Sequence, residues 1–248
     1  MVPRALTPVG VALVDKPAGP SSFAIVAALR RRTRARTGHA GTLDPFATGL
    51  LLLLSGAATR LAPCFVGLDK RYVTDIDLTA TTSTGDPEGE PLERHAAPGE
   101  QALEDALERL RGEVELRVPA ASAVKVGGER AYKLARRGVA VEMPLRRSRV
   151  HSLEVIAYTE ETVQLSLHVG SGTYVRSIAR ALGGHCTTLR RTAVGPFEVA
   201  DARAVEDAEL LTAGAALTRL SPDALEQVPA AVRAGVLALD DPEGGAVA

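Results

Sequence analysis

The sequence predicts an α+β fold in which a mixed, largely antiparallel sheet is flanked by helices. Strand-like and helix-like segments both occur, several strand-like segments follow one another directly, and no regular strand–helix alternation connects them. Hydrophobic residues make up 46% and charged residues 24% of the 248 residues, which is usual for a globular chain that buries a core. The length allows one large domain, or a domain with a small appendix.

The first quarter of the chain is expected to form a strand, a helix, a loop and a second strand. Residues 10–15 have the apolar character of a buried strand, and a Pro/Gly turn leads into a helix that Ser21 or Ser22 caps. The expected apolar face of this helix consists of Phe23, Ile25, Val26, Ala28 and Leu29. Residues 37–49 are rich in Gly, Thr and Pro, which predicts a loop before a core strand over 50–55.

The rest of the chain is expected to mix strands and helices. Residues 71–82 alternate in the manner of a half-buried strand, and residues 100–110 have the apolar spacing of an amphipathic helix. The other expected elements are short helices at 57–66 and 130–137, a helix at 173–182, a polar turn region at 83–100, and strands near 122–126, 150–158, 162–169 and 193–199. Beyond about residue 201 the chain is acidic and helical, and residues 241–248 are expected to fray.

Positive charge is concentrated in two stretches. Residues 1–200 carry 26 Lys and Arg against 21 Asp and Glu, whereas residues 201–248 carry 3 against 9. Residues 30–36 hold five arginines and no acid, and residues 116–151 hold nine basic residues against two acidic ones. Because arginine binds phosphate in a bidentate fashion, both stretches are candidate nucleic-acid contacts.

Several classes of function are excluded by what the sequence lacks. There is no apolar run long enough to span a bilayer and no export-signal pattern, so we expect a cytoplasmic protein without a membrane partner. Cys64 and Cys186 stand 122 positions apart outside any CxxC pattern, which favours neither a disulfide framework nor a zinc site. The histidines lack ligand spacing and the glycine-rich segments lack nucleotide-binding fingerprints, so neither a metal nor a cofactor is expected.

The segment 38–49 is the most unusual loop because it carries His39 and Asp44 among many Gly and Thr residues. Asp44 precedes Pro45, which disfavours the helical backbone conformation and fixes where the carboxylate points. Asp-Pro is also a common turn starter, so the loop alone does not distinguish a catalytic from a structural aspartate.

Six segments of residues 9–200 together resemble the tRNA pseudouridine-55 synthases of the TruB family. In chain order they are GVALVDKPAGPSS, TGHAGTLDPFATGLL, LDKRYV, SAVKVGGERAYKLARRG, VGSGTYVRSIARALG and LRRTAVGPF. The resemblance implies an isomerase with a pseudouridine synthase-like catalytic domain. Such an enzyme flips the T-loop uridine at position 55 of tRNA out of its stack and converts it to pseudouridine without a cofactor.

The same resemblance implies roles for individual residues. Asp44 matches the catalytic aspartate of the family, which forms a covalent adduct or assists glycal formation. Arg176 matches the arginine that pairs with this aspartate, and Tyr72 matches the tyrosine that stacks on the flipped base. The implied substrate-binding residues are His39, Lys16, Pro17, Gly41, Thr42, Tyr174, Lys125 and Arg136.

The resemblance also sets the expected organisation of the chain. Residues 1–200 are expected to form the catalytic domain, with an RNA-gripping insertion near 117–149. Residues 201–248 are too few and too acidic for the PUA-type RNA-binding domain that family members commonly carry, so they are expected to form a short helical extension. We expect a monomer whose partner is the T-arm of tRNA.

One alternative stays open. An RNA-binding or tRNA-folding chaperone on the same scaffold would explain the basic stretches without any chemistry. Such a protein has no need of a catalytic aspartate, so the presence of Asp44 together with Tyr72 and Arg176 favours the enzyme.

Overall fold

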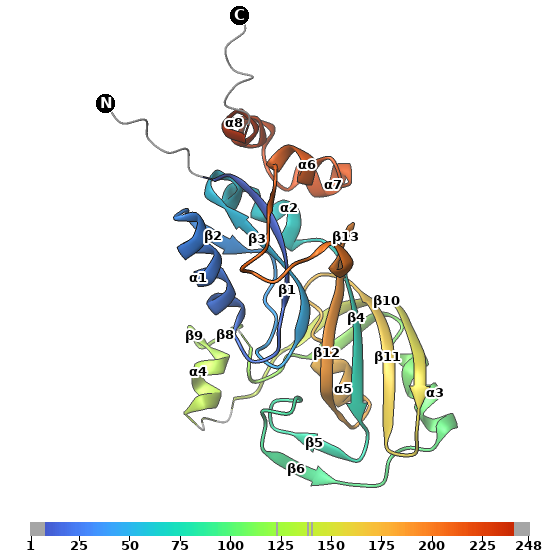
Figure 1. Ribbon diagram of the computed structural model, residues 1–248. Helices are drawn as coiled ribbons and strands as arrows, with labels where there is room; N and C mark the ends of the chain where they lie inside the picture. The colour runs from blue at the N-terminus through green and yellow to red at the C-terminus, as the bar shows by residue number, and fades with distance from the viewer. Residues whose placement is uncertain (1–7, 123, 138, 140, 241–248) are drawn as a thin grey trace, which may run out of the picture. The chain divides into compact units, whose positions relative to one another are not determined.

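The computed structural model describes residues 8–122, 124–137, 139 and 141–240 (Figure 1). The chain divides into two compact units, of which unit 1 is Met1–Lys70 with Arg190–Ala248 and unit 2 is Arg71–Leu189. The boundary expected between residues 200 and 201 therefore falls inside unit 1. The fraying expected at 241–248 lies outside the described residues.

The sheet of unit 1 is built on one continuous antiparallel pair. Strand β1 (Gly10–Lys16) pairs with β3 (Thr48–Ser55) from Gly10↔Ser55 to Lys16↔Gly49. The strand order is β14 (Leu210–Leu211), β1, β3 and then β12 (His185–Val194), which runs parallel to β3 in this unit. The five leucines of β3 are fully buried, which confirms the core strand expected there.

Two smaller strands differ from the expectation. The predicted loop at 37–49 is shorter, because β2 (Thr37–His39) pairs with β3 and β3 itself begins at Thr48. The strand expected at 193–199 is a tight hairpin, in which Val194 of β12 pairs with Phe197 of β13 (Phe197–Glu198). Both short strands gain their backbone partners from tertiary pairing, which local composition does not report.

The first helix, α1 (Ser22–Thr33), begins and ends as the sequence predicts. The Ser21 side chain accepts a hydrogen bond from the Ala24 amide at 3.2 Å, and Arg30, Arg31 and Arg32 occupy the last turn. Ile25, Val26 and Leu29 are buried, but Phe23, expected on the same face, is 67% exposed. Its position on the helix points away from the stripe formed by the other three.

The carboxyl-terminal segment completes the core of unit 1. Three short helices, α6 (Ala213–Leu217), α7 (Pro222–Glu226) and α8 (Ala230–Asp240), follow β14. Leu217, Val228 and Val236 belong to the same buried cluster as residues from η1 (Gly56–Leu61) and α2 (Ala62–Val66). The segment is helical as expected, and it is an integral layer of this unit (Figure 1).

Unit 2 has a sheet of its own strands in the order β12, β4 (Lys70–Asp77), β11 (Thr162–Val169), β10 (Leu145–Tyr158) and β7 (Gly112–Arg117). Residues 185–189 of β12 lie in this unit, where the Thr74 hydroxyl on β4 donates to the Thr188 carbonyl at 2.6 Å. Helices α3 (Glu100–Arg109) and α5 (Val175–Ala181) confirm the two helices expected near these positions.

Three elements of unit 2 differ from the expectation. The strand expected over 71–82 ends at Asp77. The Asp77 carboxylate accepts hydrogen bonds from the amide and the hydroxyl of Thr79, both at 2.7 Å. The remaining residues form β5 (Ala80–Thr82), which pairs with β6 (Pro91–Arg94). Strand β7 and the first half of β12 lie where no strand was expected, because their charged and polar residues hide the alternation. The expected strand at 122–126 is reduced to β8 (Lys125–Val126), which pairs with β9 (Glu129–Arg130) before α4 (Ala131–Arg136).

Among the described residues, no helix is both long and apolar enough to cross a membrane.

The burial of α6 predicts a stability effect. We expect Leu217→Ala to lower the free energy of unfolding by about 2–4 kcal/mol, because a buried leucine loses its contacts and leaves a cavity. Leu239→Ala, at a 57% exposed position of α8, is the matched control and should change it by less than about 0.5 kcal/mol. Urea unfolding followed by circular dichroism measures both, and equal effects would contradict the integral role of this segment.

Candidate functional site

Asp44 lies in the loop 40–47 of unit 1, between β2 and β3, and this loop is fixed by its surroundings. The Ser22 hydroxyl at the start of α1 donates to the Leu43 carbonyl and accepts from the Leu43 amide, both at 2.8 Å. The Gly19 amide donates to the Pro45 carbonyl at 2.8 Å. The half-buried Asp44 is therefore held between two anchored neighbours.

Lys16 anchors the far side of the same loop from the end of β1. Its side chain is fully buried, and its ammonium donates to the carbonyls of Pro17, Pro45 and Ala47 at 2.8, 3.0 and 2.6 Å. A buried ammonium that donates three hydrogen bonds is fully satisfied by backbone. Lys16 is therefore a positioning residue for the loop, and its expected role in substrate binding stays a prediction, as does that of the exposed Pro17 beside it.

Arg191 on β12 holds the amino-terminal half of the loop. Its guanidinium donates to the carbonyls of Leu50 at 2.7 Å, Gly41 at 3.1 Å and Thr42 at 3.4 Å, and the residue is 1% exposed. Arg191 and Lys16 are the largest fully buried side chains among the described residues. Arg191 was not predicted as a site residue, because two adjacent arginines in a strand are usually exposed to solvent.

Two glycines are required where the loop meets these cations. Gly41 has φ +108° and Gly49 has φ +101°, a backbone conformation that residues with a side chain rarely adopt. A Cβ on Gly49 would lie 2.2 Å from the Arg191 carbonyl oxygen, so no other residue fits there. Gly41 thus serves the backbone conformation, while the exposed Thr42 beside it presents its side chain outward.

Burial shifts the pKa of two groups in this part of unit 1. The pKa of Lys70 falls to about 8 because the ammonium is desolvated and the Arg191 charge adds repulsion, which the Asp69 carboxylate partly opposes. The Lys70 ammonium donates to the carbonyls of Val66 and Leu68. Desolvation, helped by Arg191, also lowers the pKa of His39, so this imidazole is neutral at neutral pH. Its Nδ1 is buried and makes no hydrogen bond within the described chain.

Tyr72 and Arg176, the other two expected catalytic residues, both lie in unit 2. Tyr72 is on β4 and is 8% exposed, and Arg176 is in the first turn of α5 and is 3% exposed. The Arg176 guanidinium lies 3.1 Å from the Asp86 carboxylate and donates to the carbonyls of Thr84 and Ala121 at 2.8 and 2.9 Å. Its orientation is therefore fixed from two sides within this unit.

Asp86 is a residue that the sequence analysis missed. Its side chain is 5% exposed, and its Oδ1 accepts hydrogen bonds from the Thr84 hydroxyl and the Glu88 amide. The signal available was Asp86-Pro87, the same dipeptide as Asp44-Pro45, within a segment that we assigned to a polar turn. Removing this carboxylate would leave the buried charge of its arginine partner without compensation.

The remaining expected substrate-binding residues lie in or beside the insertion near 117–149. Tyr174 packs against the small apolar cluster of Val118, Ala131 and Met143. Lys125 is exposed and lines an open groove of about 550 Å³ together with Arg117 and other insertion residues. Arg136 ends α4, and its side chain and Gly138 lie outside what the structure describes.

Several cations of the two basic stretches are already engaged. Arg32 donates to the carbonyls of Val205 and Ala208, so it ties α1 to the carboxyl-terminal segment. Arg137 pairs with Glu129 at 2.8 Å, and Arg149 lies 3.4 Å from Glu113. The charge available to a polyanion is therefore smaller than the sequence count suggests.

Comparison with known proteins assigns the chain to a family. Residues 30–175 match the model of the "TruB family pseudouridylate synthase (N terminal domain)". The chain belongs to this family. A tRNA pseudouridine synthase B from Xanthomonas campestris pv. campestris (strain B100) is 44% identical over 197 residues, which cover 76% of this chain and 64% of the relative. One from Mycobacterium bovis (strain BCG / Pasteur 1173P2) is 42% identical over 214 residues, which cover 80% and 71%.

A solved structure has a fold similar to that of this chain. A chain from the crystal structure of a Cbf5-Nop10-Gar1 complex matches with a TM-score of 0.58 and 29% identity, covering 76% of this chain and 50% of that one. This confirms the predicted α+β fold of the pseudouridine synthases, with a mixed sheet flanked by helices. The chain spans 64% of the length of the first curated relatives that it matches.

The depressed pKa of Lys70 predicts a pH-dependent stability. Between about pH 8 and pH 10.5 the folded protein has released this proton while the unfolded chain still binds it, so this contribution to the free energy of unfolding rises with pH. Lys70→Met removes the contribution, and we expect the wild type to gain stability relative to it across this window. Urea unfolding at several pH values tests this. Lys133→Met, at an exposed position, is the control, and a parallel pH course of Lys70→Met and wild type would contradict the assignment.

The buried pair predicts a second effect. We expect Asp86→Asn to lower the free energy of unfolding by about 3 kcal/mol or more, because Arg176 stays buried without its carboxylate. The double variant Asp86→Asn/Arg176→Met should lose less than Asp86→Asn alone. Glu113→Gln breaks the exposed pair with Arg149 and should cost less than about 1 kcal/mol. Chemical unfolding gives all three values, and a silent Asp86→Asn would show that the carbonyls alone satisfy Arg176.

Proposed function

We propose that this chain is a tRNA pseudouridine synthase, an isomerase that converts the T-loop uridine at position 55 to pseudouridine. The support is its membership of the TruB family and its 42–44% identity to relatives named tRNA pseudouridine synthase B. The reaction breaks the glycosidic bond to the uracil nitrogen and forms a bond from the same sugar carbon to carbon 5 of the base. It is redox-neutral, so the proposal calls for no cofactor.

The observation that carries this proposal is the way Asp44 is held. Lys16, Arg191 and Ser22 anchor the backbone on both sides of it through eight hydrogen bonds to loop and flanking carbonyl and amide groups. A reacting carboxylate needs such preorganisation, because a small displacement of the attacking group lowers the rate steeply. Asp44 then either attacks the sugar as a nucleophile or assists departure of the base as a glycal forms.

The other two catalytic roles are carried by residues of unit 2. Tyr72 offers a planar ring for stacking on the flipped uracil and a hydroxyl that can move a proton. Arg176 supplies a cation that keeps the catalytic carboxylate ionised, and Asp86 acts as its positioning partner. An arginine fixed by a carboxylate and two carbonyls has little freedom to turn away during the reaction.

Substrate binding is assigned to residues around the loop and in the insertion. The neutral His39, with a buried Nδ1, is suited to hydrogen-bond an uncharged part of the extruded nucleotide, and Gly41 and Thr42 follow it in the adjoining loop. Lys125, Arg136 and Tyr174 would grip the T-arm from the insertion. The chain would act as a monomer in the cytoplasm, where tRNA is modified.

The test is Asp44→Asn, which keeps the shape of the side chain and removes its charge. We expect the single-turnover rate on an unmodified T-arm hairpin, followed by pseudouridine mapping, to fall by at least about a thousandfold. RNA affinity and thermal unfolding should stay near the wild-type values. Asp105→Asn, on the exposed face of α3, is the control and should keep full activity. A wild-type protein that binds the hairpin without forming pseudouridine would favour the RNA chaperone instead.

A further inference from the structure

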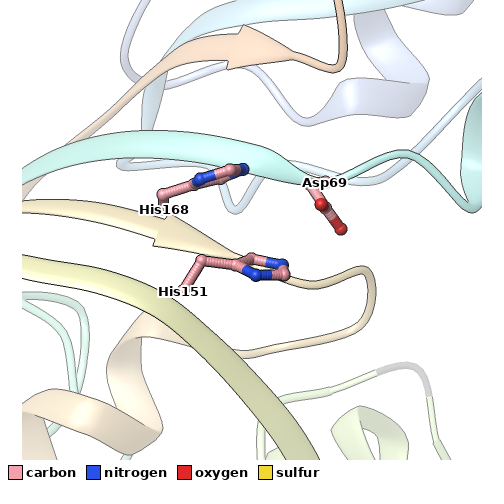
Figure 2. Close-up of side chains that lie close together, drawn as sticks. All are labelled: Asp69, His151 and His168. Carbon is pink, nitrogen blue, oxygen red and sulfur yellow. The ribbon is translucent and has the colours of Figure 1, made fainter. Parts of the chain in front are cut away.

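Two histidines on neighbouring strands of unit 2 lie face to face. His151 comes from β10 and His168 from β11, and their ring centroids are 4.6 Å apart with the ring planes inclined by 34° (Figure 2). His151 is exposed and His168 is half-buried. The roles proposed above for the reaction use neither residue.

A β-bulge lies where the two rings meet. Val150 pairs with Val169, but the next pair is Ser152 with His168, so β10 has one extra residue, His151, at this step. In a regular strand, successive side chains point to opposite faces, so His151, which follows the buried Val150, points to the outer face. At the bulge both His151 and Ser152 stand opposite His168, so the two rings share that face.

We propose that His151 and His168 form a binding site for one divalent transition-metal ion of the Zn²⁺ or Ni²⁺ kind. Imidazole nitrogen is a preferred ligand of these ions, and each ring presents one. The two ligand nitrogens lie within 4.8 Å of one another. A tetrahedral ion with Zn–N bonds of about 2.0–2.1 Å needs a separation of roughly 3.3 Å, so a small rotation of the exposed His151 ring closes the gap.

The ligand chemistry selects among ions. Two neutral nitrogen donors favour zinc, nickel and copper over magnesium and calcium, which take oxygen ligands. Water completes the coordination in this proposal. A bound ion would cross-link β10 and β11 at the bulge, and because it binds the folded protein it would stabilise unit 2 by mass action. The site is independent of the proposed isomerase activity, since it uses none of the residues assigned to that reaction.

The test is metal titration of the full chain without a polyhistidine tag. In isothermal titration calorimetry we expect one Zn²⁺ or Ni²⁺ per chain, tighter binding of Ni²⁺ than of Co²⁺, and no heat from Mg²⁺. His151→Ala and His168→Gln should each weaken Zn²⁺ binding at least about tenfold, and the double variant should abolish it. The control is His95→Ala, because the His95 ring nitrogens face the carbonyls of Ala96 and Gly183 in another part of the unit, at 3.0 and 2.8 Å.

A second measurement separates ligand loss from misfolding. Zn²⁺ should raise the thermal unfolding temperature of the wild type and of His95→Ala, and it should leave that of His151→Ala unchanged. Because His151 is exposed, its substitution should not lower the unfolding temperature of the metal-free protein. Absence of Zn²⁺ and Ni²⁺ binding by the wild type, or unchanged binding by the double variant, would overturn the proposal and leave the two rings as a packing pair.

Discussion

The structure of unit 1 depends on three buried cations that are satisfied by backbone carbonyls. Lys16, Lys70 and Arg191 are at most 6% exposed, and each donates to two or three carbonyl oxygens of the segments around the Asp44 loop and α2. A buried charge is costly unless hydrogen bonds compensate for the lost water. The loop must therefore keep the one conformation that supplies its carbonyls to Lys16 and Arg191, and this requirement fixes the backbone that carries Asp44.

Unit 2 uses the complementary solution for its own buried cation. Arg176 is held by a carboxylate, Asp86, in addition to two carbonyls, so that a negative charge lies beside its positive charge. The two arrangements suit different tasks. Cations that bind carbonyls immobilise a loop. An arginine that is paired with a carboxylate is held in one orientation, which suits the chemistry proposed for Arg176.

Residue pattern was sufficient for the elements whose partners are apolar. The run of leucines in β3, the alternation of β11 and the capped α1 all follow from local signals, because an apolar face must be buried whatever its partner is. The same logic failed for β7 and for the first half of β12, where side chains that face solvent or bind backbone break the pattern. Phe23 was misassigned for a different reason: it is apolar, but its position on the helix lies off the stripe formed by the buried residues.

The sequence by itself determined the family, the identity of the expected catalytic residues and the glycine-rich character of the Asp44 loop, because these depend on residue type at fixed spacing. Only the tertiary structure decided which buried groups hold the expected catalytic residues and their loop in place. Lys16 became an anchor, Asp86 and Arg191 emerged as positioning residues, and His151 met His168 across a bulge. These relations join positions up to 175 residues apart, as between Lys16 and Arg191 around one loop. Hydrogen-bond satisfaction and strand register act through space, and a linear pattern does not contain them.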